Sequence, residues 1–194
     1  MKQDIKRKII NATIKLIEEK ANKPEDVTVR DICKEAEVGL SQINYHFQTK
    51  ENLIAQCIQE IIGNVISNVP RESPLLQGKS AAETLKLRML YTLNFLYANE
   101  NISRISILTD QHNARIGDNT NQTINGYSPL VEAVCRERNI TADPKELAAL
   151  MVFSLQGMFL RTDVVRDVLG IDLRSEAGRK KLADNYVETT FREV

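Results

Sequence analysis

Apolar residues recur every three or four positions along most of the chain. The first stretch shows this spacing in Ile5, Ile9, Ala12 and Leu16, which places these side chains on one face of a helix. No stretch alternates between apolar and polar residues with the two-residue period of a strand. The pattern therefore predicts an all-α fold with about nine helices.

The expected helices are separated by short breaks that contain Gly, Pro or Asn. The first helix should end before "ANKPED", a short second one should begin after Thr28, and a third should begin near Gly39. Thr28 is the expected N-cap of the second helix, and Asp31 completes an acidic variant of the capping box. Further helices are expected over residues 50–69, 80–98, 102–114, 120–138, 144–169 and 175–192.

The segment "NVPRESPLLQGKS" interrupts the apolar pattern near residue 70 and marks the expected domain boundary. It separates a small unit, residues 1–50, from a larger one, residues 70–194, and the helix over residues 50–69 connects them. In the larger unit, Gly117, Gly126 and Pro129 argue against one straight helix through the polar piece "DQHNARIGDNTNQTINGYSP".

The first three helices have the proportions of a helix-turn-helix unit, with the tight turn at Glu37-Val38-Gly39. In such a unit the third helix enters the major groove of DNA, and its exposed side chains meet base edges. Ile43 and Phe47 are four residues apart and should face the core. The outward faces then hold Leu40, Ser41, Gln42, Asn44, Tyr45 and His46.

These outward residues have the chemistry that DNA contact requires. Amides such as Asn44 and Gln42 can pair with an adenine edge, Ser41 can serve any base, and Leu40 can meet a thymine methyl group. Tyr45, His46 and Lys50 can donate to phosphate oxygens, and Lys50 also opens a helix, whose N-terminus attracts anions. The alternative is an ordinary helical hairpin whose amides are merely solvated.

The charge of the chain is unusual for a DNA-binding protein. Lys plus Arg equals Asp plus Glu at 26 each, and residues 1–60 contain ten of each sign. DNA-binding modules are usually basic. The remaining positive charge is local, because Lys2, Lys6, Arg7 and Lys8 face only Asp4 in the first eight residues. Dimerisation would double whatever electrostatic attraction the module has.

The stretch "TVRDICKEAEVGLSQINYHFQTKENLI" resembles the N-terminal signature of the TetR family of transcriptional regulators. The match includes the Thr cap, the Tyr45-His46-Phe47 ending and Lys50-Glu51-x-Leu53. Two positions depart from the family pattern: Glu37 stands where a Gly in left-handed conformation is usual, and Gly39 replaces a Ser N-cap.

The resemblance implies a division of roles among these residues. The positions nearest base edges would be Arg30, Leu40, Ser41 and Asn44. Those nearest phosphates would be Thr28, Gln42, Tyr45, His46 and Lys50. It also implies a homodimer on a near-palindromic double-stranded DNA operator, most often as a repressor released by a small molecule.

The stretch "LAALMVFSLQGMFL" has eleven apolar residues in fourteen and so must be covered on all sides. It is too short to span a membrane and is followed by Arg161. One side can pack on its own core and the other on a second copy. The family resemblance implies a four-helix dimer interface from residues 144–169 and 175–192, the latter through the stripe Ala183, Val187, Thr190 and Val194. The alternative is that both helices are simply internal.

The larger unit is the expected effector-binding domain. Candidates for its ligand pocket lie at mid-helix positions and in one polar loop: Met89, Phe95, His112, Phe153, Gln156 and Phe159. Asp110 and Asn113 could add polar contacts beside His112. Each apolar candidate could equally be plain core, and the polar ones could be solvated.

An enzyme is the main competing class. The chain has two His residues and lacks His-Glu-x-x-His, Gly-x-Ser-x-Gly and a Gly-rich phosphate loop. We therefore expect no catalytic residues, metal site or cofactor. The other alternative is a helical adaptor that binds only protein, which would leave Asn44, Tyr45 and His46 without a role.

Cys33, Cys57 and Cys135 are expected to be buried small hydrophobes rather than a redox switch. The first residues, "MKQDIKRKII", lack the apolar run of a signal peptide, so a cytoplasmic protein is expected.

Overall fold

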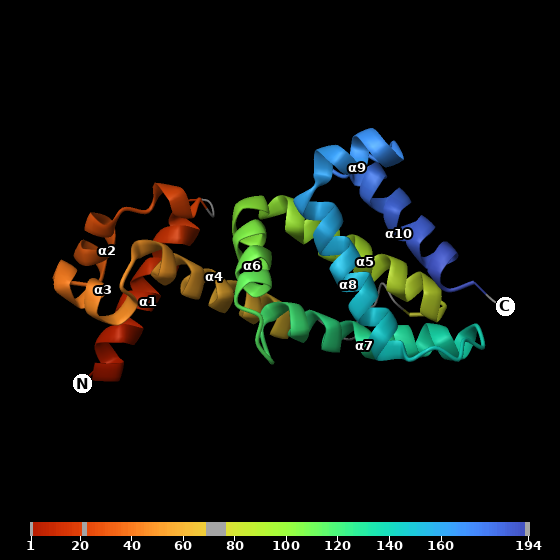
Figure 1. Ribbon diagram of the computed structural model, residues 1–194, viewed down its shortest axis with the longest axis horizontal. Coiled ribbons are helices and arrows are strands. Elements are labelled where there is room, and N and C mark those ends of the chain that lie inside the picture. Colours follow the sequence, from red (N-terminus) through yellow and green to blue (C-terminus); the bar gives the residue numbers. More distant parts are fainter. Residues whose placement is uncertain (1, 21–22, 69–76, 193–194) are drawn as a thin grey trace. The chain divides into compact units, whose positions relative to one another are not determined.

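The computed structural model describes residues 2–20, 23–68 and 77–192, and these residues contain helices and no strand. The prediction of an all-α fold is confirmed. The elements are α1 (Lys2–Glu19), a short 3₁₀ helix (Pro24–Asp26), α2 (Val29–Glu35), α3 (Leu40–Phe47), α4 (Lys50–Ser67), α5 (Ala81–Ala98), α6 (Glu100–His112), α7 (Asn119–Glu137), α8 (Pro144–Leu160), α9 (Thr162–Leu169) and α10 (Glu176–Thr190) (Figure 1).

The chain divides into two compact units. The first comprises Met1–Ser67 and Asn99–Asn119, and the second comprises Asn68–Ala98 and Thr120–Val194. Helix α6 lies beyond the interruption near residue 70, yet it belongs with α4 in the first unit. Residue 69, where the fourth helix was expected to end, and the centre of that interruption lie outside the described residues.

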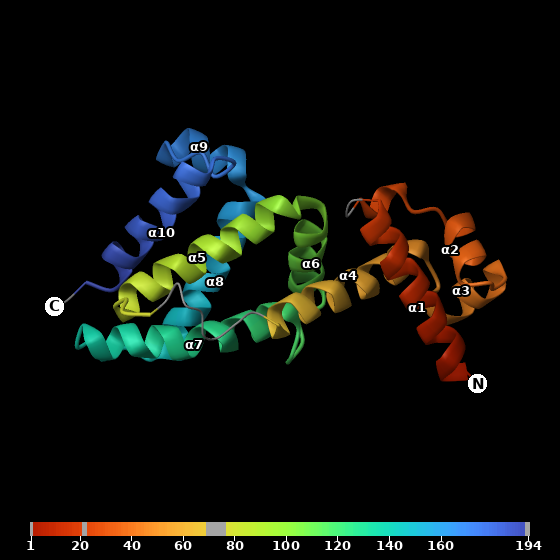
Figure 2. The same cartoon turned by 180° about the vertical axis from the view of Figure 1, so that it is seen from behind.

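The hydrophobic core of the first unit lies between α1, α2, α3 and α4. Figure 2 shows the first three helices grouped around the start of α4. The apolar face expected for α1 is buried from Ile9 onward, with Ile5 half-buried, and the side chains on which α2, α3 and α4 pack are buried too. The buried residues include Ile9, Ala12, Leu16, Ile17, Ile32, Ile43, Phe47, Leu53, Cys57 and Ile58.

A polar cluster of Gln59, Ser106, Asp110 and Asn119 joins α4 to α6 and to the start of α7. Gln59 Nε2 donates to Asp110 Oδ1 at 2.8 Å, and Asn119 Nδ2 donates to Gln59 Oε1 at 2.6 Å and to Ser106 Oγ at 3.1 Å. A Cβ atom at Gly63, one turn after Gln59, would lie 3.2 Å from Asn119 Oδ1. The buried polar contacts and this close approach explain why α6 belongs to the first unit.

The core of the second unit includes α5, α7, α8 and α10, and α10 packs along α5. Ala183 and Val187 on α10 are buried in this core. The expectation that they face a second copy is therefore wrong, because α5 already covers them. Thr190 of the same stripe is exposed, and Val194 lies outside the described residues.

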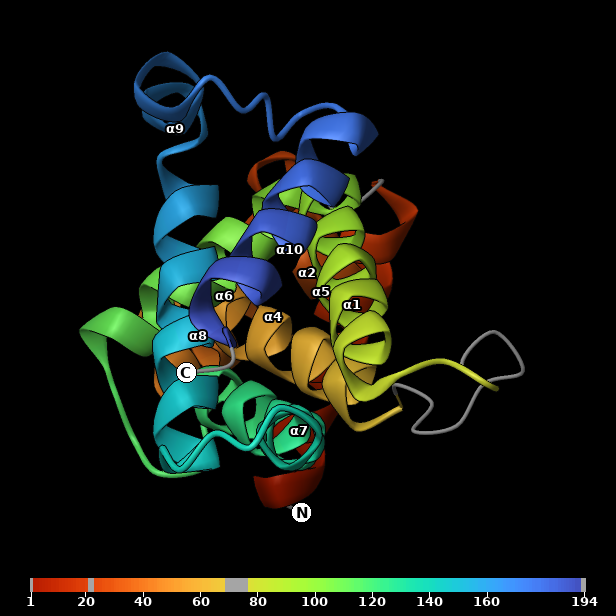
Figure 3. The same ribbon diagram turned by 90° about the vertical axis from the view of Figure 1, so that its right-hand side faces the viewer.

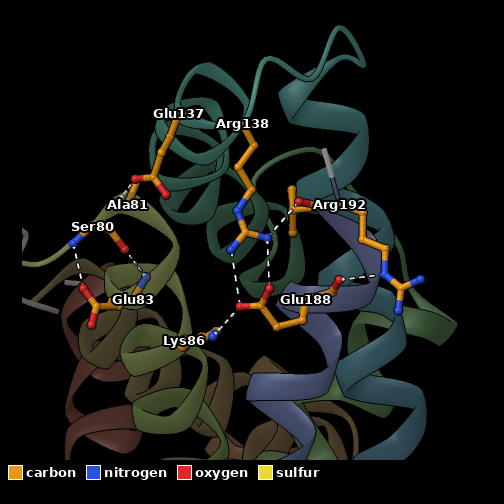
Figure 4. A network of polar contacts seen from close by, with 9 residues as sticks. Ser80, Ala81, Glu83, Lys86, Glu137, Arg138, Glu188 and Arg192 are labelled. Atoms are coloured by element: carbon orange, nitrogen blue, oxygen red, sulfur yellow. Dashed lines mark hydrogen bonds and ion pairs between the residues drawn. The ribbon is translucent and has the colours of Figure 1, made fainter. Parts of the chain in front are cut away.

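Ion pairs hold the C-terminal end of α10 in place (Figure 4). Glu188 accepts from Lys86 Nζ on α5 at 2.6 Å and from Arg138, just after α7, at 3.3 Å. Arg138 also donates to the Phe191 carbonyl oxygen at 2.8 Å. Lys86 first, and then Arg138, lower the pKa of Glu188 because both favour its charged form.

The single helix expected over residues 144–169 is wrong: α8 ends at Leu160, and α9 follows after a bend of 97°. Figure 3 shows α9 at the upper end of α8, running in a different direction. Thr162 Oγ1 donates to the Phe159 carbonyl oxygen and also bonds with the Tyr97 hydroxyl, each at 2.7 Å. A hydroxyl that bonds to the backbone in this way favours a helix end. The described residues therefore form ten α-helices rather than nine.

The polar piece around residues 110–129 is broken, as the glycines suggested, but only in part. Gly117 lies in the break between α6 and α7 with φ of +87°. Gly126 and Pro129 instead lie inside the continuous helix α7. Pro129 removes the donor for the carbonyl of Asn125, and since both residues are exposed, solvent can satisfy that carbonyl.

Among the described residues, no single helix has both the length and the apolar composition of a membrane span. Only α8 and α9 taken together reach that composition, and the bend separates them.

Replacing Gly178 with Ala should destabilise the second unit. An added Cβ would lie 1.8 Å from the Asp172 carbonyl oxygen, so the backbone must move. We expect a loss of about 1–3 kcal/mol in the free energy of unfolding measured in urea. Gly126→Ala is the matched control, because its added Cβ meets nothing within 4 Å and should stabilise α7 by up to about 1 kcal/mol. Equal effects of the two substitutions would contradict the packing of Gly178.

Candidate DNA-binding surface

Helix α2 begins with a reciprocal capping box, as predicted. Thr28 Oγ1 accepts from the Asp31 backbone N–H, and the Thr28 N–H donates to Asp31 Oδ2, both at 3.1 Å. Lys20 Nζ lies 3.1 Å from the same carboxylate. The bond from Lys20, followed by those from Thr28, lowers the pKa of Asp31 to about 2. The cap fixes the residue at which α2 begins, and so the position of Arg30, which is exposed on this helix.

The turn between α2 and α3 is as tight as the sequence indicated. Glu37 has φ of +49°, which confirms the left-handed conformation expected there, and the Val38 N–H donates to the Cys33 carbonyl oxygen at 3.0 Å. Gly39 is the N-cap of α3, and without a side-chain oxygen it makes no side-chain cap bond. The chain is thereby redirected so that α3 begins at Leu40.

Helix α3 is anchored by two buried side chains, Ile43 and Phe47, whose exposed fractions are 1% and 4%. Leu40 and Tyr45 are 54% and 65% exposed, and Ser41 and Asn44 are also exposed. Gln42 and His46 are half-buried, so they flank this row rather than lie in it. We call Leu40, Ser41, Asn44 and Tyr45 the outward row.

The start of α4 adds a second element to the surface. Thr49 Oγ1 accepts from the Asn52 N–H at 3.1 Å, and Asn52 Nδ2 donates to the Phe47 carbonyl oxygen at 3.2 Å. Thr49 was not predicted as a helix cap, although Thr is a preferred N-cap residue. Lys50 is the first residue of α4, so its ammonium and the helix N-terminus attract anions together.

The positive charge expected at the start of α1 is largely neutralised. Arg7 Nη1 donates to Glu60 Oε2 at 2.7 Å, and Lys8 Nζ donates to Glu37 Oε2 at 2.8 Å. These pairs leave Arg7 and Lys8 with little excess charge for DNA. Lys6 lies instead with its Nζ 5.6 Å from the centre of the Phe47 ring, beside the end of α3.

The residues nominated for a ligand pocket are not all brought together. Met89 and Phe159 are fully buried, and Phe95 is half-buried. Phe153 is 56% exposed on α8, so it lies away from the core that buries Met89. His112 is exposed and belongs to the first unit, whereas the other five nominated residues belong to the second.

Gln156 is the nominated pocket residue with unusual surroundings. Its side chain is buried, and its Nε2 donates to Thr120 Oγ1 at 2.9 Å. Its Oε1 is buried without a hydrogen-bond partner among the described residues. A buried amide left half-satisfied requires an explanation, and a bound molecule is one.

Within the described residues, no three His, Cys, Asp or Glu side chains gather as a metal site. Cys57 and Cys135 are buried and Cys33 is half-buried, all as free thiols. Burial raises the pKa of Cys57 to about 12, which makes it unreactive at neutral pH.

Comparison with known proteins agrees with this geometry. The family model described as "Bacterial regulatory proteins, tetR family" matches residues 9–57, from α1 to the middle of α4. The fatty acid metabolism regulator protein of Bacillus subtilis (strain 168) is 25% identical over 165 residues, which cover 82% of this chain and 83% of that protein. The structure of Salmonella enterica GusR is similar in fold, with a TM-score of 0.55 and 14% identity over 97% of this chain and 95% of that one.

The family match begins on α1 and ends on α4, so it spans the capping box, the left-handed turn, the outward row and Lys50. The helices that follow agree in fold with a solved protein over nearly their whole length. Residues 9–57 thus carry the helix-turn-helix of the TetR family of bacterial regulatory proteins.

Proposed function

We propose that this protein is a ligand-responsive repressor that binds a near-palindromic operator as a homodimer. The observation that carries the DNA-binding part is the outward row on α3, whose four residues are all exposed while Ile43 and Phe47 hold the helix in the core. An amide, a hydroxyl, a phenol and a short apolar side chain together match the donors, acceptors and methyl groups of the major groove. The proposal includes no catalytic step.

The contacts divide into two groups. Arg30, Leu40, Ser41 and Asn44 contact base edges, and the remaining residues contact phosphates: Thr28, Gln42, Tyr45, His46 and Lys50. Phosphate contacts position the protein, whereas base contacts specify the sequence. The half-buried positions of Gln42 and His46, beside the row, suit the phosphate group.

The dimer forms through the exposed face of α8. Leu150 and Phe153 are 54% and 56% exposed, whereas the other α8 residues after Glu146 are buried or half-buried. Burying both side chains would remove apolar surface from water. α10 contributes with its polar face, since its apolar stripe is already covered. Twofold pairing places two copies of α3 about 34–36 Å apart, one turn of DNA.

The effector binds in the second unit and uses the free end of the Gln156 amide. The amide oxygen and nitrogen can exchange places by a flip, so the free end can accept from or donate to a ligand. The B. subtilis relative is named as a regulator of fatty acid metabolism, which makes fatty acids the first compounds to test.

The effector should raise the melting temperature of the wild type and release it from the duplex, and both effects should be lost in Gln156→Leu. A compound that acts equally on the wild type and on Gln156→Leu would exclude a role of the Gln156 amide in effector binding.

Asn44→Ala and Lys50→Ala should weaken DNA binding in different ways. On a duplex recovered by selection from random DNA, Asn44→Ala should lose about 1–3 kcal/mol and relax the preference at one base position. Lys50→Ala should weaken all sequences alike and reduce the salt slope of log K by about one. Fluorescence anisotropy over a series of single-base variants measures both effects. Identical profiles for the two variants would contradict the division of roles.

Phe153→Lys should convert the dimer to a monomer, because two buried ammonium groups would face each other across the twofold axis. Analytical ultracentrifugation at micromolar concentration measures the change. Val168→Lys on α9 is the matched control, since Val168 is 72% exposed and lies outside the proposed interface. A wild-type chain that sediments as a monomer would remove the dimer from the proposal.

A further inference from the structure

Each acidic residue between Thr28 and Lys50, the segment that holds α2, the turn and α3, pairs with a lysine from outside that segment. Between Thr28 and Lys50 the acids are Asp31, Glu35 and Glu37. Their partners are, in the same order, Lys20 at 3.1 Å, Lys15 at 2.6 Å and Lys8 at 2.8 Å. We call these three lysines, on α1 and the residue that follows it, the lysine ladder.

The lysines run antiparallel to their partners: their residue numbers fall as those of the acids along α2 and the turn rise. Lys20 meets the first acid of α2, Lys15 meets one near its end, and Lys8 meets the acid of the turn. All six side chains remain at least one-third exposed. Exposed pairs of this kind contribute little to folding stability, so stability alone does not account for three of them in a row.

The effect on charge is larger than the effect on stability. Between Thr28 and Lys50 the cations are Arg30, Lys34 and Lys50, equal in number to the acids, so the segment is formally neutral. Within the described residues, none of these three cations has an ion-pair partner in the structure. Once the ladder has neutralised the acids, the segment from Thr28 to Lys50 keeps three positive charges.

Without the ladder, Glu37 would repel DNA. It lies three residues before the first residue of α3, a separation of at most about 10 Å along the chain. The Debye length is about 10 Å at 0.1 M salt, so a carboxylate at Glu37 acts on phosphates beside α3 with little screening. Glu37 also occupies a left-handed position that Gly would adopt without strain, so its charge has no evident benefit to the turn itself.

We propose that Lys8, Lys15 and Lys20 set the DNA affinity without touching DNA, by neutralising the three carboxylates of the helix-turn-helix. The inference rests on the proposed function, because it has meaning only if α3 enters the major groove. It explains how a module with no net charge can bind a polyanion. It also distinguishes the ladder from Lys50, which acts on phosphates directly.

The test is a cycle of Lys8→Met, Glu37→Gln and the double variant, with duplex affinity measured by anisotropy from low to moderate salt. Gln keeps the strain of the left-handed position and removes only the charge. Lys8→Met should weaken binding about threefold at 0.1 M salt, and Glu37→Gln should strengthen it by a similar factor. The double variant should return to within about twofold of the wild type, with an unchanged salt slope.

A direct contact between Lys8 and a phosphate predicts a different result. The double variant would then keep the loss of Lys8→Met, and its salt slope would fall by about one. That outcome would overturn the proposal for this pair. The same substitutions at Lys15 and Glu35 give a second, independent test. Lys86→Met, which breaks a pair of 2.6 Å in the second unit, is the control and should leave affinity unchanged.

Two further readouts separate the possible failures. Circular dichroism and thermal melting must be alike for all variants, because every substituted group is partly exposed. If the wild type shows no salt-dependent binding to any duplex, the proposed function itself fails. If the wild type binds but the double variant does not recover its affinity, only the role of the ladder is overturned.

Discussion

Burial of Ile43 and Phe47 is the interaction on which the DNA-binding surface depends. Two apolar side chains four residues apart fix both the position of α3 and its rotation about its own axis. Rotation of α3 by a quarter turn would bury Asn44 or Tyr45 and expose an apolar side chain in their place. The core between α1, α2 and α4 therefore determines which residues of α3 are exposed.

The connection of α4 to the rest of the first unit has a different physical character. Gln59, Asp110 and Asn119 are joined by directional hydrogen bonds in a buried site, and Gly63 leaves room for them. Such a cluster loses most of its stabilisation when one partner moves, because a buried polar group is then left unsatisfied. Asn119 is followed directly by Thr120, whose hydroxyl accepts from Gln156.

Features set by local chemistry could be predicted from the sequence. The capping box at Thr28, the left-handed Glu37 and the buried face of α3 each follow from residues within a few positions of one another. The break at Arg161 could not be predicted, because the hydroxyl of Thr162 bonds with Tyr97, 65 residues earlier. The apolar stripe of α10 was assigned to the wrong partner because periodicity shows that a face is buried but not what covers it. The ion pairs of Lys8, Lys15 and Lys20 could not be predicted for the same reason, because composition counts the charges without showing which ones lie close together.

The most direct test of the central claim is methylation interference on a duplex that the wild-type protein selects from random DNA. Methyl groups on guanine N7 project into the major groove, where the outward row of α3 is expected to lie. The account predicts interference in two major-groove segments one helical turn apart, and loss of part of that pattern in Asn44→Ala. Interference spread evenly along the duplex, or none at all despite binding, would contradict it.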